Sequence, residues 1–270
     1  MTDQTSGAAP PVATVSQSGP GILANVLVYL GEVTVLLAQA LRFIVRGRLN
    51  ARDLMQQMSF LGVNSVVIAL LTSFSSGAVI ALYFAQFLVQ YGQQWLVGAV
   101  VSLAISRELA PVLTGVVVAA RAGSAIAAEI GTMKVTEQID ALRALAVDPV
   151  EYLVPPRLIA GLIMLPIVCA LADASGILGG YLVSVYMEGV PAGSFPLSIR
   201  QFLEPTDFTR GLIKTVFFGL IIVIVGCHQG LRTRGGATEV GRATTNSVVL
   251  SIVFIYIADF FLARVLFLGA

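Results

Sequence analysis

The chain has 270 residues, of which 57% are hydrophobic and only 11% are charged, and its mean hydropathy is +0.89. Soluble domains carry about 25% charged residues, so this composition indicates an integral membrane protein. The 16 basic residues and 15 acidic residues give a net charge of +1, so we expect neither a nucleic-acid-binding surface nor an acidic tail. Cys169 and Cys227 both fall in apolar runs and are expected to be packing residues.

The N-terminal part of the chain divides into two segments. Residues 1–20 are rich in Ser, Thr, Pro, Gly and Ala and show no periodicity, which predicts a disordered tail. Residues 21–61 are predicted to be an interfacial amphipathic helix region. The apolar run 22–41 has Glu32 near its centre and is followed by a group of arginines: Arg42, Arg46, Arg48 and Arg52. This mixture favours a helix that lies in the membrane interface, and a membrane span is the alternative.

Residues 62–270 contain five runs that are long and apolar enough to cross a membrane. A helix needs about 20 residues to cross the roughly 30 Å hydrocarbon core. The five runs are residues 62–90, 109–128, 158–187, 211–227 and 248–268. The predicted fold is therefore an all-α membrane protein with five transmembrane helices, preceded by an interfacial helix.

Basic residues in the connections predict the orientation. Nine lie before the first span, between the second and third, and between the fourth and fifth: Arg42, Arg46, Arg48, Arg52, Lys134, Arg143, Arg232, Arg234 and Arg242. The other side has only Arg200 and Arg210. Because cytoplasmic loops are enriched in basic residues, the N-terminus is expected in the cytoplasm.

Small residues recur at every fourth position of the second span. They are Gly115, Ala119, Gly123, Ala127 and Gly131. Such a ladder allows another helix to approach closely. The partner helix could belong to the same chain or to a second copy.

Charged residues within the spans are costly unless they are paired or face water. Arg107, Glu108 and Lys214 are predicted to lie at a similar depth and could line a cavity open to the outside; a structural ion pair, or a lysine that reaches the interface, is the alternative. Asp173 and Asp259 are expected deeper, where they could satisfy neighbouring backbone or hydroxyl groups.

A polar helix is predicted over residues 134–148, between the second and third spans. Val135, Ile139, Leu142 and Ala146 form an apolar stripe at helical spacing. Thr136 is a candidate N-cap, and Asp148-Pro149 is expected to stop the helix, because the residue before a proline is disfavoured in the α conformation. Such a helix cannot lie in hydrocarbon and is suited to docking a soluble partner.

Two blocks of sequence carry a family resemblance. The first block comprises RELAP (107–111), AARAGSAIAAEIGTM (119–133), EQIDAL (137–142) and VDP (147–149). The second comprises GCHQG (226–230), GGA (235–237), VG (240–241) and ATT (243–245). Both resemble MlaE-type permeases, the membrane subunits of MCE-system lipid ABC transporters, and the likeness extends from about residue 30 to the end of the chain.

The resemblance implies a five-span permease domain over residues 62–270 that forms a homodimer and moves phospholipid or a related lipid. It also implies a pair of cytoplasmic ABC ATPase subunits, an MCE-domain lipid-binding protein on the outer face, and the bacterial inner (plasma) membrane as location. The helix at 134–148 would be the coupling helix. Together with the apolar stripe, this gives the expected ATPase contacts Glu137, Ile139, Asp140, Leu142 and Arg143. The expected lipid-cavity residues are Arg107, Glu108, Lys214 and Tyr91.

Enzymatic sites find little support in the sequence. A phosphate-binding loop needs Gly before Lys, whereas Lys134 follows Met133 and Lys214 follows Ile213. ATP hydrolysis is therefore expected in a partner chain, and no cofactor is expected. His228 is the single histidine and is expected to pack at a helix end, so no metal site is predicted.

The competing hypothesis is an autonomous secondary transporter or channel, in which Asp173 and Asp259 would relay protons or cations. Such a protein does not need a coupling-type helix, and the sequence lacks the inverted repeats with broken helices typical of such transporters. A membrane scaffold would leave Arg107 and Glu108 unexplained. The sequence thus favours a lipid permease driven by a separate ATPase.

Overall fold

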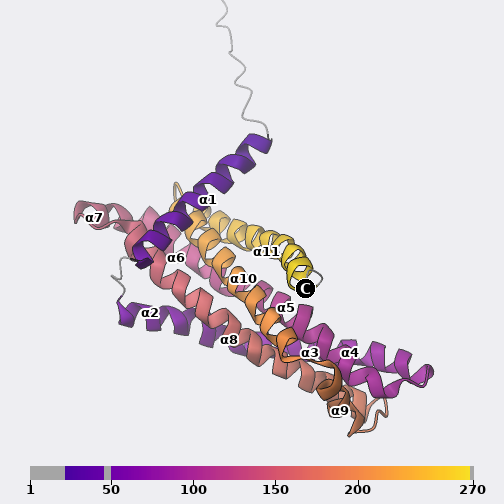
Figure 1. The fold of residues 1–270 in the computed structure, drawn as a ribbon. Coiled ribbons are helices and arrows are strands. Elements are labelled where there is room, and N and C mark those ends of the chain that lie inside the picture. The colour runs from indigo at the N-terminus through magenta and orange to yellow at the C-terminus, as the bar shows by residue number, and fades with distance from the viewer. Residues whose placement is uncertain (1–21, 46–49, 268–270) are drawn as a thin grey trace, which may run out of the picture.

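A computed structural model of the chain describes residues 22–45 and 50–267, and its regular structure over those residues is helical. The predicted tail at 1–20 lies outside the described residues. The helices form an elongated bundle, with α7 at one end and α9 at the other (Figure 1). The α-helices are α1 Ile22–Val45, α2 Ala51–Met58, α3 Asn64–Gln90, α4 Val97–Ala104, α5 Ala110–Val118, α6 Ser124–Val135, α7 Gln138–Ala144, α8 Pro149–Tyr186, α9 Ser194–Phe202, α10 Pro205–Leu231 and α11 Ala237–Phe267.

Six continuous helical stretches within the described residues are long and apolar enough to cross a membrane. They are Val26–Val45, Ala51–Gln90, Gln94–Val135, Pro149–Tyr186, Pro205–Leu231 and Ala237–Phe267. The last five contain the five predicted runs, except that α8 ends one residue before Met187 and that residue 268 lies outside the described residues. Three of them have 40, 42 and 38 residues, well beyond the roughly 20 that cross hydrocarbon. These helices therefore extend past the apolar layer or cross it at a tilt.

The remaining stretch, Val26–Val45, belongs to α1, the predicted interfacial helix. In Figure 1, α1 runs crosswise to α8 and α10, near the end of the bundle that carries α7, and it packs on both helices. Its Glu32 carboxylate lies 2.9 Å from His228 Nε2 and 2.9 Å from an Arg232 guanidinium nitrogen. These pairs attach the middle of α1 to the C-terminal end of α10.

Three π-helical turns interrupt the long helices, at Ser59–Val63, Ile105–Leu109 and Ala119–Gly123. A π turn widens the helix and is frequent at functional sites. Basic side chains donate to carbonyls in two of these turns: Lys214 Nζ to the Arg107 carbonyl at 2.9 Å, and Arg121 to the Phe60 carbonyl at 2.8 Å. Arg121 also donates to Ser65 Oγ at 3.2 Å and so links the stretch Gln94–Val135 to the stretch Ala51–Gln90.

Close helix packing depends on glycine where α8 meets α10. A Cβ atom on Gly219 would lie 2.7 Å from the carbonyl oxygen of Gly161, which is too close for a real side chain. In a membrane such contacts hold helices together, because lipid provides no hydrophobic driving force between them.

The small-residue ladder of the second spanning helix packs within the chain. Cβ atoms on Gly115, Gly123 and Gly131 would meet Phe218, Ile222 and Thr233 at 3.0–3.2 Å, all in or just after α10. Ala119 and Ala127, the other members of the ladder, are fully buried. The ladder therefore accommodates α10 of the same chain, which resolves the alternative that the sequence left open.

The start of α7 differs from the sequence prediction. Thr136 is not its N-cap: it ends α6, and its hydroxyl donates to the Thr132 carbonyl at 2.8 Å. Glu137 occupies the N-cap position in the left-handed conformation, with φ +61°. This conformation turns the chain sharply and starts a separate helix at Gln138, later than the predicted position 134.

The end of α7 also comes earlier than predicted, at Ala144. Ala146 has φ +59°, and the Val147 N–H donates to the Leu142 carbonyl at 3.0 Å, which are features of a Schellman C-cap. Asp148-Pro149 therefore does not stop α7. Instead, the Asp148 carboxylate accepts the Val150 N–H at 2.9 Å and caps α8, with Pro149 as the first helical residue.

Candidate functional site

A buried lysine organises the charged residues nearer the α9 end of the bundle. The Lys214 side chain is 0% exposed, and its Nζ lies 2.8 Å from Glu108 Oε2 and 3.0 Å from Asp259 Oδ1. With the Arg107 carbonyl, it therefore has three oxygen partners, two from the π turn at Ile105–Leu109 and one from α11. A buried ammonium is tolerated only when it is paired in this way.

Arg107 is fixed by an acidic residue, Asp207, that is not among the sites predicted from the sequence. Asp207 Oδ1 lies 2.8 Å from Arg107 Nη2 and accepts a hydrogen bond from Nε at 3.0 Å. Asp207 is 2% exposed, and its Oδ2 accepts the Glu204 N–H at 3.2 Å in a capping box. The pattern Glu204-Pro205-x-Asp207 is a helix-start signal that places Asp207 in the first turn of α10 and could have identified it.

The cluster has one side open to the surroundings. The side chains of Arg107 and Glu108 are 41% and 46% exposed, whereas Lys214 beneath them is fully enclosed. The Phe267 ring centroid lies 5.2 Å from both the Arg107 guanidinium carbon and Lys214 Nζ. This site therefore offers cationic groups and an aromatic face next to one another.

The structure brings Arg107, Glu108 and Lys214 together, and it adds Asp259. The expectation that Asp259 lies deeper and satisfies backbone or hydroxyl groups is wrong, because its carboxylate pairs with Lys214. Asp173 instead accepts a hydrogen bond from Ser106 Oγ at 2.9 Å and is 3% exposed. The two aspartates thus have separate partners.

Tyr91 lies apart from this cluster's contacts. It follows the last residue of α3, is 67% exposed, and its ring centroid is 4.8 Å from that of Phe87. No charged group of the cluster contacts it among the interactions of the described residues.

At the other end of the bundle, α7 presents a polar surface. Asp140 lies 3.2 Å from Lys134 Nζ and 3.0 Å from an Arg143 nitrogen, and all three side chains are at least a quarter exposed. Leu145, which follows α7, is 75% exposed. Glu137 is also exposed, and Leu142 is partly buried.

Ile139 differs from the expectation for a partner-contacting residue. Its side chain is 1% exposed and belongs to the hydrophobic core that joins α6, α8 and α10. Ile139, a member of the apolar stripe, therefore anchors α7 to its own chain and is not accessible to a partner in this structure.

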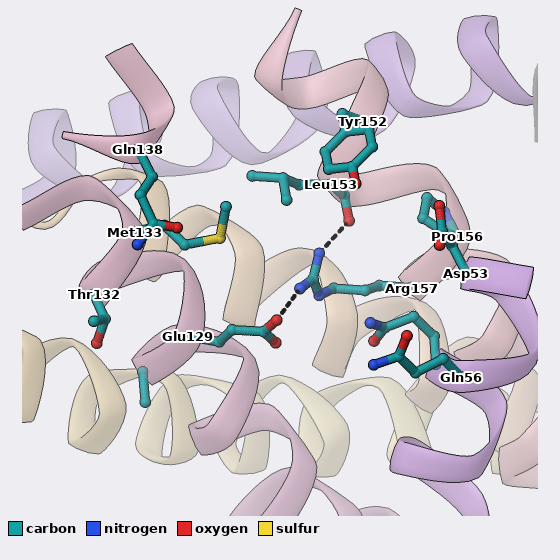
Figure 2. A pocket seen from close by; sticks show the side chains of 12 residues that line it. Asp53, Gln56, Glu129, Thr132, Met133, Gln138, Tyr152, Leu153, Pro156 and Arg157 are labelled. Carbon is teal, nitrogen blue, oxygen red and sulfur yellow. Dashed lines mark hydrogen bonds and ion pairs between the residues drawn. The ribbon is translucent and has the colours of Figure 1, made fainter. Parts of the chain in front are cut away.

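A pocket of about 670 Å³ lies beside α7, between α2, α6 and α8. Two of its lining residues, Glu129 and Arg157, point toward one another in Figure 2 and form an ion pair at 2.9 Å. Arg157 also donates to the Leu153 carbonyl at 2.8 Å. The Arg157 side chain is 4% exposed and that of Glu129 is 48% exposed. Gln138 of α7 and Asp53 of α2 line the same pocket.

The Glu129–Arg157 pair is not among the sites predicted from the sequence. Both residues are charged and lie near the ends of otherwise apolar spanning helices. Because a charged side chain in such a helix is energetically costly, the two charges were a signal that could have predicted the pair. Among the described residues, no group of three or more His, Cys, Asp or Glu side chains is placed to hold a metal ion.

The chain matches the family model described as Permease MlaE over residues 54–265. A Synechocystis protein named "Probable ABC transporter permease protein" is 45% identical over 234 residues, which cover 87% of this chain and 89% of the relative. A Rickettsia typhi protein with the same description is 39% identical over 257 residues, covering 91% and 99%.

A plant relative matches over a similar length. The Arabidopsis thaliana chloroplast protein named TRIGALACTOSYLDIACYLGLYCEROL 1 is 40% identical over 239 residues, which cover 88% of this chain and 68% of that protein. The family model spans most of this chain, and the bacterial relatives match it over nearly their full length. This all-helical membrane protein therefore belongs to the MlaE family of ABC transporter permeases.

Proposed function

We propose that this chain is the membrane subunit of a transporter that moves phospholipid or a related lipid between the membrane and an MCE-domain lipid-binding partner. A separate cytoplasmic ABC ATPase drives the movement. The name of the Arabidopsis relative refers to a diacylglycerol lipid, and this supports a lipid as substrate.

The observation that carries the proposal is the half-exposed charged cluster in an apolar bundle. Arg107 and Glu108 are partly exposed above the enclosed Lys214. A phospholipid headgroup supplies a phosphate for Arg107, which can bind phosphate in a bidentate manner. The surrounding spans supply apolar surface for the acyl chains, and Tyr91 would lie at the outer mouth.

In the proposed topology, the α7 end faces the cytoplasm and the α9 end faces outward. Five helices span the membrane, and α1 lies in the cytoplasmic interface with the N-terminus inside. Two observations support this placement of α1: its crosswise direction in Figure 1, and the contacts of Glu32 with the end of α10, which are a hydrogen bond with His228 and an ion pair with Arg232. Cysteines placed at Thr238 and Ser194 should react from opposite sides of the membrane, and labelling of both from the same side would contradict the topology.

The ATPase would dock on α7 through its exposed residues. These are Glu137, Asp140, Arg143 and Leu145, with Leu142 at the edge. The neighbouring pocket adds Glu129 and Gln138 to the same face. A second copy of the permease completes a homodimer in the bacterial inner membrane.

A reconstituted system tests this function. The permease, its ATPase and an MCE-domain acceptor should transfer labelled phospholipid in an ATP-dependent manner. Leu145→Asp places a charge on the proposed docking surface without changing a buried residue, so it should lower both ATPase co-purification and transfer by about tenfold. Met187→Asp, at a 69%-exposed position toward the α9 end, is the matched control.

Two results would contradict the proposal. ATP-dependent transfer at the original rate in the Leu145→Asp variant would remove α7 as the docking site. Lipid movement by the permease alone, driven by an ion gradient, would favour the secondary transporter. The separate partners of Asp173 and Asp259 argue against a relay between them.

A further inference from the structure

A second hollow lies far from the charged cluster, between α1 and the C-terminal end of α10. We call it the α1 groove; its volume is about 810 Å³. The α1 residues that line it share one helical face: Val28, Gly31, Glu32, Val35, Leu36 and Gln39. The α10 side contributes His228, Leu231 and Arg232, followed by Arg234. The groove therefore has apolar walls along α1 and basic groups at one end.

The charges in the groove are not balanced. Glu32 is shared by His228 and Arg232, at 2.9 Å from each. After the connection between α10 and α11, Arg242 of α11 is paired with Glu239 at 3.0 Å. Arg234 is exposed and makes no ion pair or hydrogen bond with any residue that the structure describes. It also lines the adjoining hollow between α10 and α11, so an unpaired guanidinium is available at the end of an apolar groove.

We propose that the α1 groove binds an anionic phospholipid of the cytoplasmic leaflet, with the lipid phosphate on Arg234 and acyl chains along Val28 and Val35. Basic pockets between helices on the cytoplasmic side are suited to anionic headgroups, and a guanidinium can bind phosphate in a bidentate manner. Because a zwitterionic headgroup brings its own cation, an anionic lipid matches the uncompensated charge better.

The remaining surface of α1 favours a lipid over a soluble partner. Leu27, Leu30 and Leu41 are 68%, 43% and 46% exposed, as expected for an amphipathic helix that lies among lipids. Acyl chains can reach the groove along this apolar surface, and the bound lipid holds α1 against α10. The proposal uses the cytoplasmic placement of α1 given above but does not depend on the lipid cavity near Arg107.

Photo-crosslinking with the full-length protein in detergent tests the site. Phosphatidylglycerol with a diazirine near its headgroup should label peptides from α1 and from the α10–α11 connection, and a phosphatidylcholine analogue should label them less. Arg234→Gln should lower this labelling about tenfold, the effect of losing one charged hydrogen-bonded contact. Val35→Trp, which fills the groove and keeps every charge, should lower it as well.

Arg52→Gln is the matched control, because it removes an exposed charge from the same end of the bundle without touching the groove. Its labelling should stay within about twofold of the original protein, as expected for a surface charge remote from the ligand. Arg107→Gln should lower labelling near the outer cluster and leave the α1 groove unaffected. This pair of results separates failure of the groove from failure of the proposed lipid cavity.

Four results would overturn the proposal. Unchanged labelling in Arg234→Gln would show that this guanidinium does not hold the lipid. An equal fall in Arg52→Gln would indicate general electrostatics. Millimolar inorganic phosphate could remove the labelling completely, which would indicate a site for a soluble anion. Finally, Arg234→Gln could release the ATPase while lipid labelling persists, which would make this connection a protein contact.

Discussion

Ion pairs at the two ends of the bundle differ in their access to water. Near the α9 end, Lys214 is 0% exposed and contacts Glu108 and Asp259. Near the α7 end, Asp140 is 49% exposed and contacts Lys134 and Arg143. Water can replace a lost partner at α7 but not around Lys214. The same kind of interaction should therefore have very different energetic consequences at the two ends.

The largest effect is expected at Lys214. Lys214→Met leaves Glu108 and Asp259 without their shared cation and should lower the free energy of unfolding by about 3–5 kcal/mol. Chemical denaturation in detergent measures the change. Combining it with Glu108→Gln and Asp259→Asn should recover part of the loss, because no unpaired charge remains. A stable single variant would show that Lys214 is not energetically buried.

A smaller effect is expected where Asp207 holds Arg107. A double-mutant cycle with Asp207→Asn and Arg107→Gln should give a coupling energy of about 1.5–3 kcal/mol, since the hydrogen bonds are charged and Asp207 is buried. Asparagine can still accept the Glu204 N–H, which preserves the helix cap. Additive single effects would contradict direct coupling.

Breaking the Glu129–Arg157 pair beside α7 should have an intermediate effect on the free energy of unfolding, because only Arg157 is buried. Glu129→Gln leaves the enclosed Arg157 with the Leu153 carbonyl and should cost about 1–2 kcal/mol in the same unfolding measurement. Glu137→Gln, at an exposed residue nearby, is the control and should change little. Equal losses in both variants would mean that the burial of Arg157 has no effect.

The smallest effect is expected at Asp140. Asp140→Ala removes two surface ion pairs and should change the free energy of unfolding by no more than about 1 kcal/mol. Raising the salt concentration should reduce even this difference, because exposed pairs are screened. A loss comparable to that of Lys214→Met would contradict the comparison between the two ends.

The sequence was sufficient to group Arg107, Glu108 and Lys214. Charges in apolar spans are rare and costly, so their depth along each helix is informative. Depth alone did not reveal the Lys214–Asp259 pair, because it says nothing about how α10 and α11 are rotated about their axes. The link between Asp207 and Arg107 was missed for a similar reason: it depends on where α10 begins.

Around α7 the sequence predicted the helix but not its contacts. An amphipathic stripe shows that one face is buried, and it does not say whether the chain itself or a partner covers that face. Ile139 turned out to be covered by the chain's own core. The left-handed residues Glu137 and Ala146, which set the bounds of α7, are not glycines, so the sequence carried no signal for these turns.

Bound lipid in variants of Arg107 is the most direct test of a lipid cavity near Lys214. Mass spectrometry of lipid extracted from purified permease should show at least about a tenfold loss of phospholipid in Arg107→Glu, because the reversed charge repels the phosphate, and a smaller loss in Arg107→Gln. Arg200→Glu, at an exposed residue of α9, should retain the original amount. If Arg107→Glu binds as much phospholipid as the unchanged protein and transports it at the same rate, the cluster is a structural ion-pair site and the lipid-cavity account is wrong.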